Sequence, residues 1–538
     1  MPTLDKELKK SKGGSDHHAI VPNKRVTKSK IIRDYLIKIQ MRHQSPSTWA
    51  VICICIAAAL HFALGFSIEF SVDEAHYALY AKHLALSYFD HPPLVGWIQW
   101  PLVTLNSTEG IIRIIPEALW LLSMYLVYQV TIKVHHLMQG RNSGYLTNIL
   151  PSAPACGFMA ILAVIAAPVP NILAIGLLPD TILTPLSLCL MLMALRWLKK
   201  DEFTLVDWII TGVLLGLAGL SKYTAAFTAF ALLLVLLVST KKPWISKAGF
   251  WLALFIAFVL IFPVLYWNWV NNWISFKYQI AHGAGNTWAW RRVAAFIGIQ
   301  VVCFGPLILM GVYTFFKDCW HSNKPSLLSL LSFFFIPFSI FTSLSGGGSL
   351  PHWTNPAWFC LAPFAGIGLA KAWSINHRWF IRILFTLQLL LCLVGFGFVV
   401  AGGINSTTIK ANPIADLYGW KMAGEKAAEL AKTTHAKGIA VQNWTLGSRT
   451  AWYAKPIPVF VLDQRQDQFD LWFGPLPAGA SVVLINWSGM PFNSPIGTNQ
   501  AFERCEPLDE LEVLRFGQVL SRFQFSLCSN WQGTGLEH

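Results

Sequence analysis

The stretch Asp73-Glu-Ala-His-Tyr77, followed by Tyr88-Phe-Asp-His-Pro-Pro93, places carboxylates and imidazoles directly after an apolar run over residues 48–68. Charged groups at a membrane edge are costly to desolvate, so they commonly have a function there. The two prolines end any helix before them and stiffen the backbone, which fixes Asp90 and His91. This arrangement favours recognition of a polar headgroup at a membrane surface.

The composition agrees with a membrane location. Hydrophobic residues make up 54% of the 538 residues and charged residues 13%, whereas a soluble domain is about 25% charged. The composition predicts a polytopic α-helical membrane protein. The net charge of +14 does not indicate a nucleic-acid partner, because the basic residues are spread over the ends of apolar segments, where they orient helices.

About 20 apolar residues cross a bilayer as a helix, and eleven segments fit this length. They are 48–68, 110–131, 148–169, 179–197, 205–220, 223–239, 247–267, 293–316, 327–344, 354–373 and 379–401. The shorter apolar segment 93–105 is expected to lie on the membrane surface as a helix. The sequence therefore predicts about 11–13 transmembrane helices over residues 48–404.

The charges of the loops predict the orientation. The arm over residues 1–47 has eleven Lys/Arg against four Asp/Glu, which indicates a basic cytoplasmic N-terminal arm. With eleven spans, five basic loops then fall on the cytoplasmic side, and the acids and histidines near the spans fall on the other side. The same count leaves the C-terminal region extracytoplasmic.

The C-terminal region, residues 405–538, has a different pattern. Residues 415–433 predict an amphipathic helix, and three short apolar runs at 438–442, 458–462 and 481–485 predict buried strands. Helical stretches alternating with strands indicate a small α/β domain. Cys505 and Cys528 lie in this region, and an extracytoplasmic location would allow a disulfide between them.

Several side chains are candidates for chemistry on the outer side. Asp73 and Glu74 could bind a cation, act as a base or hydrogen-bond a substrate, and Tyr77 lies one helical turn from Asp73. Asp180 begins a later span, where it could also cap the helix. Lys222 lies in a short outer turn against the positive-inside bias, which favours a bound anion over simple snorkelling.

The pattern resembles the bacterial dolichyl-phosphate-mannose-protein mannosyltransferase-like glycosyltransferases, which are glycosyltransferase family 39 and include the lipid A aminoarabinose transferases. The resemblance rests on Asp-Glu-x-x-Tyr after the first span, Tyr-Phe-Asp-His-Pro-Pro-Leu, an outer Pro-Asp and the turn Leu-Ser-Lys-Tyr. Aminoarabinose transferases tend to have Glu-Lys where this chain has Asp90-His91, a difference that favours another sugar or acceptor.

The resemblance implies a GT-C fold and transfer of a sugar from a polyprenyl-phosphate donor to a lipid, glycan or protein acceptor outside the cytoplasm, at a bacterial inner membrane. It implies that Asp73 and Asp180 are catalytic. The candidate substrate-binding residues are Glu74, Tyr77, Tyr88, Asp90, His91, Arg113, Lys222 and His352. No cofactor is expected to be required, and any divalent cation would use Asp73, Asp180 and His352.

The alternative to an enzyme is a transporter or flippase of lipid-linked sugars. A transporter commonly has ionisable residues near the middle of the bilayer and internal symmetry. Here the ionisable residues gather at one interface and no repeat is visible. The sequence therefore favours the glycosyltransferase.

Overall fold

The structure is a computed structural model. It describes residues 45–139, 150–199, 202–239, 244–285, 287–319, 325–403, 412–492 and 502–533. The basic arm predicted for residues 1–47 falls almost entirely outside these residues.

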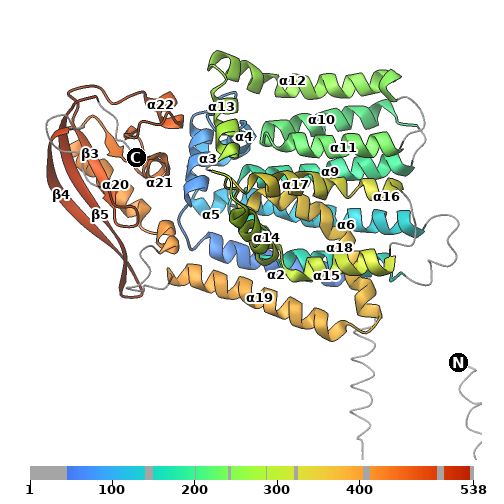
Figure 1. Ribbon diagram of the computed structural model, residues 1–538. Coiled ribbons are helices and arrows are strands. Elements are labelled where there is room, and N and C mark those ends of the chain that lie inside the picture. The colour runs from blue at the N-terminus through green and yellow to red at the C-terminus, as the bar shows by residue number, and fades with distance from the viewer. Residues whose placement is uncertain are drawn as a thin grey trace, which may run out of the picture. The chain divides into compact units, whose positions relative to one another are not determined.

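Helices form most of the described chain (Figure 1). Six segments are long and apolar enough to cross a membrane within the described ranges: α2 (Pro46–Gly65), α6 (Ile114–Gln139) with the preceding α5 (Glu109–Ile112), α9 (Pro179–Lys199), α12 (Ala248–Val270), the stretch Leu327–Leu344 and α19 (Arg378–Ala401). The stretch Leu327–Leu344 comprises α16 (Pro325–Ser329) and α17 (Ser332–Leu344). The protein is therefore a multi-pass membrane protein.

Two expected spans are broken, which corrects the prediction that 148–169 and 293–316 are single helices. The first consists of α7 (Ala153–Ile165) and α8 (Pro168–Ile175), bent by 75°. The second consists of α14 (Trp290–Phe304) and α15 (Pro306–Thr314), and its two helical parts are bent by 91°. Proline begins α8 and α15, and Gly305 before α15 has φ 85°, so the backbone cannot continue straight.

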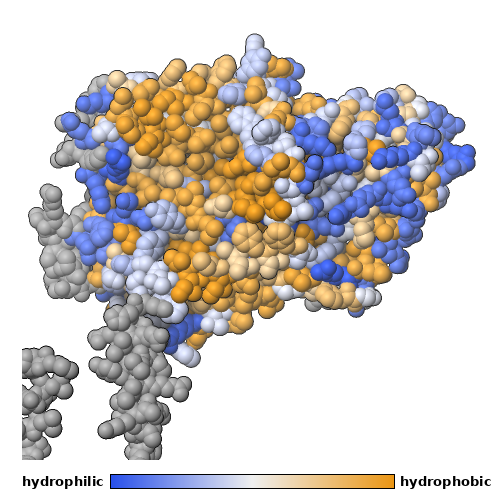
Figure 2. Space-filling view, turned by 180° about the vertical axis from the view of Figure 1, so that it is seen from behind, coloured by the Kyte–Doolittle hydropathy of each residue, from blue (hydrophilic) through white to orange (hydrophobic). Residues whose placement is uncertain are grey.

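The other expected spans are also helical. They are the shorter α10 (Leu205–Ser221) and α11 (Ala225–Ser239), and α18 (Asn355–Ser374). Helix α18 is buried over nearly its whole length and packs against α6, α7, α9 and α15, so it forms the centre of the helical part. The broad hydrophobic surface of this part is visible in Figure 2, with hydrophilic residues at its two ends.

Short elements connect the long helices. They are α3 (Val72–Lys82), α4 (Leu94–Thr104), η1 (Trp244–Ser246), α13 (Ile274–Ala284), η2 (Phe315–Cys319) and η3 (Pro351–Thr354). Helix α4 confirms that the apolar segment 93–105 is helical. Helix α3 begins with a capping box, in which the Ser71 hydroxyl accepts from the Glu74 backbone N–H and the Glu74 carboxylate accepts from the Ser71 N–H.

The C-terminal region is an α/β domain, as expected from its sequence. Its elements are η4 (Pro413–Leu417), α20 (Trp420–Thr433), β1 (Ile439–Val441), α21 (Trp444–Tyr453), β2 (Val459–Val461), α22 (Gln468–Phe473), β3 (Val482–Trp487), β4 (Phe502–Arg515) and β5 (Gln518–Trp531). The strand order is β2-β1-β3-β5-β4. Strand β1 pairs parallel with β2 and β3, whereas β5 pairs antiparallel with β3 and β4.

The long β4–β5 hairpin was not predicted, because β4 is mostly exposed and rich in charged residues and lacks an apolar pattern. Cys505 and Cys528 face each other across this hairpin and form a disulfide. The core of the domain continues into the helical part. Ala75 and Leu79 of α3 share a hydrophobic cluster with Trp452 and Val483 of the C-terminal domain, so the domain fixes the position of α3.

Candidate active site

One cavity of about 390 Å³ gathers most of the side chains predicted to have a function. Seven of them line it: Asp73, Tyr77, Asp90, His91, Asp180, Lys222 and His352. They come from α3, the following loop, the start of α9, the turn after α10, and η3. The sequence places them up to 279 residues apart, so only the tertiary fold brings them together.

Lys222 and Asp180 form a buried ion pair in this cavity. The Lys222 Nζ lies 2.8 Å and 2.6 Å from the two carboxylate oxygens of Asp180, and both side chains are almost completely buried. The His352 Nε2 lies 3.9 Å from the same carboxylate, and burial lowers the pKa of His352 to about 4. The Lys222 charge therefore has one carboxylate partner and a neutral imidazole close by.

Asp73 and Asp90, two cavity residues from the N-terminal part of the chain, lie in different environments. Loss of hydration raises the pKa of Asp73 to about 6, although the nearby His76 pulls it the other way. Burial alone would raise the pKa of Asp90 too, but His76 and a hydrogen bond donated by the Tyr80 hydroxyl hold it below its ordinary range. Two neighbouring carboxyl groups whose pKa values are shifted in opposite directions are typical of acid–base sites.

Asp73 and His91 line the cavity and have polar atoms without a hydrogen-bonding partner among the described residues. In the part of the chain that the structure describes, the Asp73 carboxylate has no hydrogen-bonding partner, and the buried His91 Nδ1 has none either. Burial lowers the pKa of His91 to about 4 against the pull of Asp90, so its imidazole is neutral near pH 7. A neutral imidazole can exchange hydrogen bonds with a sugar hydroxyl.

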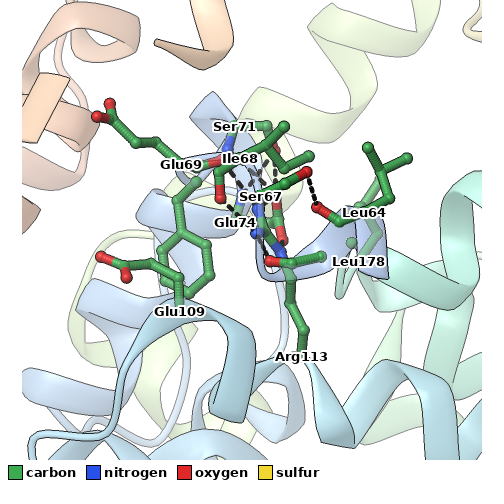
Figure 3. A network of polar contacts seen from close by, with 12 residues as sticks. Leu64, Ser67, Ile68, Glu69, Ser71, Glu74, Glu109, Arg113 and Leu178 are labelled. Carbon is green, nitrogen blue, oxygen red and sulfur yellow. Dashed lines mark hydrogen bonds and ion pairs between the residues drawn. The ribbon is translucent and has the colours of Figure 1, made fainter. Parts of the chain in front are cut away.

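Three predicted binding residues lie elsewhere. Arg113 and Glu74 form a buried ion pair, with Arg113 Nε 2.7 Å from Glu74 Oε1 (Figure 3). Arg113 also donates to the backbone oxygens of Gly65, Ile68 and Glu69, so it joins the end of α2 to the start of α3. These contacts indicate a structural role for both residues, outside the cavity.

Tyr88 is the third of these residues. It is fully buried, stacks on the Tyr80 ring with centroids 3.6 Å apart, and donates its hydroxyl to the Tyr80 backbone oxygen. These contacts fix the loop that precedes Asp90. A direct contact with substrate would require this packing to open.

The candidate metal ligands are not assembled as a cluster. Among the described residues, no group of three or more His, Cys, Asp or Glu side chains is arranged to hold a metal ion. Of the set predicted, Asp180 and His352 lie close together, but Lys222 occupies both oxygens of the Asp180 carboxylate. As it stands, the arrangement suits an anion beside Lys222 better than a cation.

The cavity also contains residues that the sequence did not single out. Trp444 reaches it from α21 of the C-terminal domain, and Tyr278 and Gln279 reach it from α13. Apolar and aromatic side chains form the remaining wall, including Phe227, Phe341 and Leu344. No local signal could have identified Trp444, because its place in the cavity depends on the packing of the C-terminal domain against α3.

Comparisons with known proteins bear on the family and the fold. Residues 90–267 match the model of the family described as dolichyl-phosphate-mannose-protein mannosyltransferase. The matched stretch includes Asp90, Asp180 and Lys222 but begins after Asp73. A search of curated protein sequences found no match.

The fold is similar to that of solved structures. ArnT from Cupriavidus metallidurans bound to undecaprenyl phosphate has 14% identity and a TM-score of 0.58, with 91% of this chain and 99% of that chain covered. Its apo state gives a TM-score of 0.56 at the same identity and coverage. This chain therefore has the fold of these GT-C structures over nearly its whole length, and residues 90–267 are similar to the mannosyltransferase family.

Proposed function

We propose that this protein transfers a sugar from a polyprenyl-phosphate donor to a lipid, glycan or protein acceptor in the cavity around Asp73 and Lys222. The observation on which this depends is the convergence of Asp73, Asp180 and Lys222 on one cavity with an aromatic and apolar wall. Such a cavity offers both a charged end for a phosphate and an apolar side for a lipid. The similar fold of ArnT, solved with undecaprenyl phosphate, supports this donor class.

Lys222 is the proposed contact of the donor phosphate. The sugar of the donor is bonded through its anomeric carbon to a phosphate oxygen, and transfer breaks this bond and leaves a polyprenyl phosphate with one more negative charge. A buried ammonium group beside that oxygen stabilises the developing charge. Asp180 holds the ammonium in place before the donor arrives, with both oxygens within 2.8 Å.

Asp73 is the proposed base. An acceptor hydroxyl must lose its proton as it attacks the anomeric carbon, and a carboxylate with a pKa of about 6 can accept that proton near neutral pH. The absence of a hydrogen-bonding partner for this carboxylate, among the described residues, leaves its oxygens accessible. With a phosphate acceptor no strong base is needed, and Asp73 would position the acceptor instead.

Tyr77, Asp90, His91 and His352 are proposed to bind the sugar or the acceptor, since all four line the cavity. Asp90 is held by Tyr80 and by its own backbone, whose oxygen accepts from Gln279. A fixed carboxylate of this kind is suited to orienting hydroxyl groups. No cofactor is required by this scheme, and activity in excess EDTA would test that expectation.

We place the cavity on the extracytoplasmic side of a bacterial inner membrane, because the loops on the opposite side are basic. Nucleotide-sugar donors are found in the cytoplasm and would then be on the opposite side of the membrane from the cavity. A periplasmic reporter enzyme fused after residue 538 should be active, whereas a reporter active only in the cytoplasm would reverse the assignment.

The central test compares the lipids and glycans of the cell envelope with and without this protein by mass spectrometry. We expect one glycan or lipid to lose a single sugar when the protein is absent. Reintroducing the wild-type protein should restore it, and Asp73→Asn should not, with a loss of at least about 100-fold in transfer. If Asp73→Asn is folded and inserted in the membrane and still transfers sugar at the wild-type rate, Asp73 is not the base.

A further inference from the structure

A second cavity lies at the end of the helical part opposite the candidate active site. Helix α18 connects the two. Its first residue, Asn355, donates to the Thr184 hydroxyl, which in turn donates to the Asp180 backbone oxygen. Its last residue, Ser374, lines the second cavity. A helix of 20 residues is about 30 Å long, so the two cavities are separated by about the thickness of a hydrocarbon core.

The wall of this cavity is almost entirely apolar, and its volume is about 520 Å³. The lining residues come from α2, α7, α15, α18 and α19, with Ala155, Leu162, Leu307, Leu369 and Phe385 among them. Helix α19 packs only loosely here, since its buried residues are Ile381, Gln388 and Cys392. In a membrane, such an open groove between helices is filled by acyl chains.

Two arginines stand at one end of the groove. Arg378 and Arg382 lie one turn apart on α19, are exposed, and line the cavity. Their guanidinium carbons lie 5.9 Å and 5.2 Å from the centre of the Trp373 ring. Arg378 also donates to the Trp373 backbone oxygen. Within the described ranges neither arginine has a carboxylate partner, so no described acidic side chain neutralises these two charges.

We propose that this groove binds one anionic phospholipid, with its phosphate between Arg378 and Arg382 and its acyl chains along the apolar wall. Basic pockets between transmembrane helices are typical sites for anionic lipid headgroups. A zwitterionic lipid would bring a cation next to the two arginines. A helix from a second copy would fill the groove with apolar side chains and leave both charges without a counter-ion.

The test uses the full chain in nanodiscs made from equal parts of phosphatidylglycerol and phosphatidylcholine. Native mass spectrometry then counts the lipids that stay bound when the protein is released. We expect the wild type to retain phosphatidylglycerol at least fivefold over phosphatidylcholine. The double variant Arg378→Ala/Arg382→Ala should lose this preference, and Lys247→Ala, which removes an exposed charge outside the cavity, should keep it.

A second variant protects the test against misfolding. Ala155→Phe leaves both arginines in place but fills part of the apolar wall, and it should also reduce the retained phosphatidylglycerol at least fivefold. Equal retention of the two lipids by the wild type would overturn the proposal. So would an unchanged preference in the double variant, or displacement of the lipid by millimolar inorganic phosphate, which would indicate an anion site without a lipid tail.

Discussion

Two buried ion pairs in this protein use the same chemistry for different ends. Arg113 has hydrogen-bond acceptors for all of its guanidinium nitrogens, in Glu74 and three backbone carbonyls. Among the described residues, Lys222 donates hydrogen bonds only to Asp180, and the pair faces a cavity. An ion pair is saturated when every donor nitrogen of its cation already has an acceptor in the protein. Such a pair, here Arg113 with Glu74, holds two helices together and has no donor left for a ligand. An unsaturated pair at a cavity can exchange one partner for a substrate phosphate.

The first prediction tests the cavity pair and has the largest effect. Lys222→Gln should lower sugar transfer by about 10²–10³-fold, because the developing phosphate charge loses its cation. The protein should still insert into the membrane, and Lys222→Arg should recover part of the activity because the charge returns. Rates measured with purified protein in liposomes would check this. Near-normal transfer by Lys222→Gln would show that the two pairs do not differ in function.

The second prediction tests the saturated pair. Arg113→Gln leaves the Glu74 carboxylate buried without its partner, which should destabilise the protein by about 3–5 kcal/mol. The loss should appear as a lower unfolding temperature and less folded protein, while transfer per folded molecule changes little. Arg113→Lys keeps the charge but has fewer donors, so its stability should lie between those of the wild type and Arg113→Gln. Loss of transfer in a fully stable Arg113→Gln variant would indicate that Arg113 acts in the active site.

The third prediction concerns pH. Asp73 must be ionised to accept a proton, so transfer should fall about tenfold per unit as the pH drops below about 6. His91 and His352, with pKa values of about 4, stay neutral over the range from 5 to 8 and should not contribute. The residual rate of Asp73→Asn should lack this dependence. A wild-type profile that is flat between pH 5 and 8 would argue against Asp73 as the base.

The smallest effect is expected at the boundary between the two parts of the molecule. Trp444→Ala removes one aromatic wall of the cavity, which we expect to cost of the order of 1 kcal/mol of binding and to raise KM about fivefold with little change in kcat. Trp472→Ala, which changes an aromatic of the same domain that does not line the cavity, is the matched control. An unchanged KM would show that the C-terminal domain only supports α3.

The sequence was sufficient for the helical part but not for every side chain in it. Long apolar runs identify spans because length and hydrophobicity are local properties, and each expected span falls on a helix or a bent pair. Glu74 was predicted to bind substrate, although Ser71-Val-Asp-Glu74 is a capping-box pattern that points to a structural role. Its pairing with Arg113, 39 residues away, could not be read from the chain.

Charge and hydropathy along the chain determined that this is a membrane protein with a small C-terminal domain. They also placed acids, imidazoles and a lysine near the ends of the spans. Both could be predicted because each segment enters the bilayer according to its own hydrophobicity and charge. Only the tertiary structure decided which of these groups share a cavity and which are saturated by neighbours. Hydrogen bonds and burial depend on side chains that are distant in sequence, and Trp444, Lys222 and Asp73 meet solely because their helices pack together.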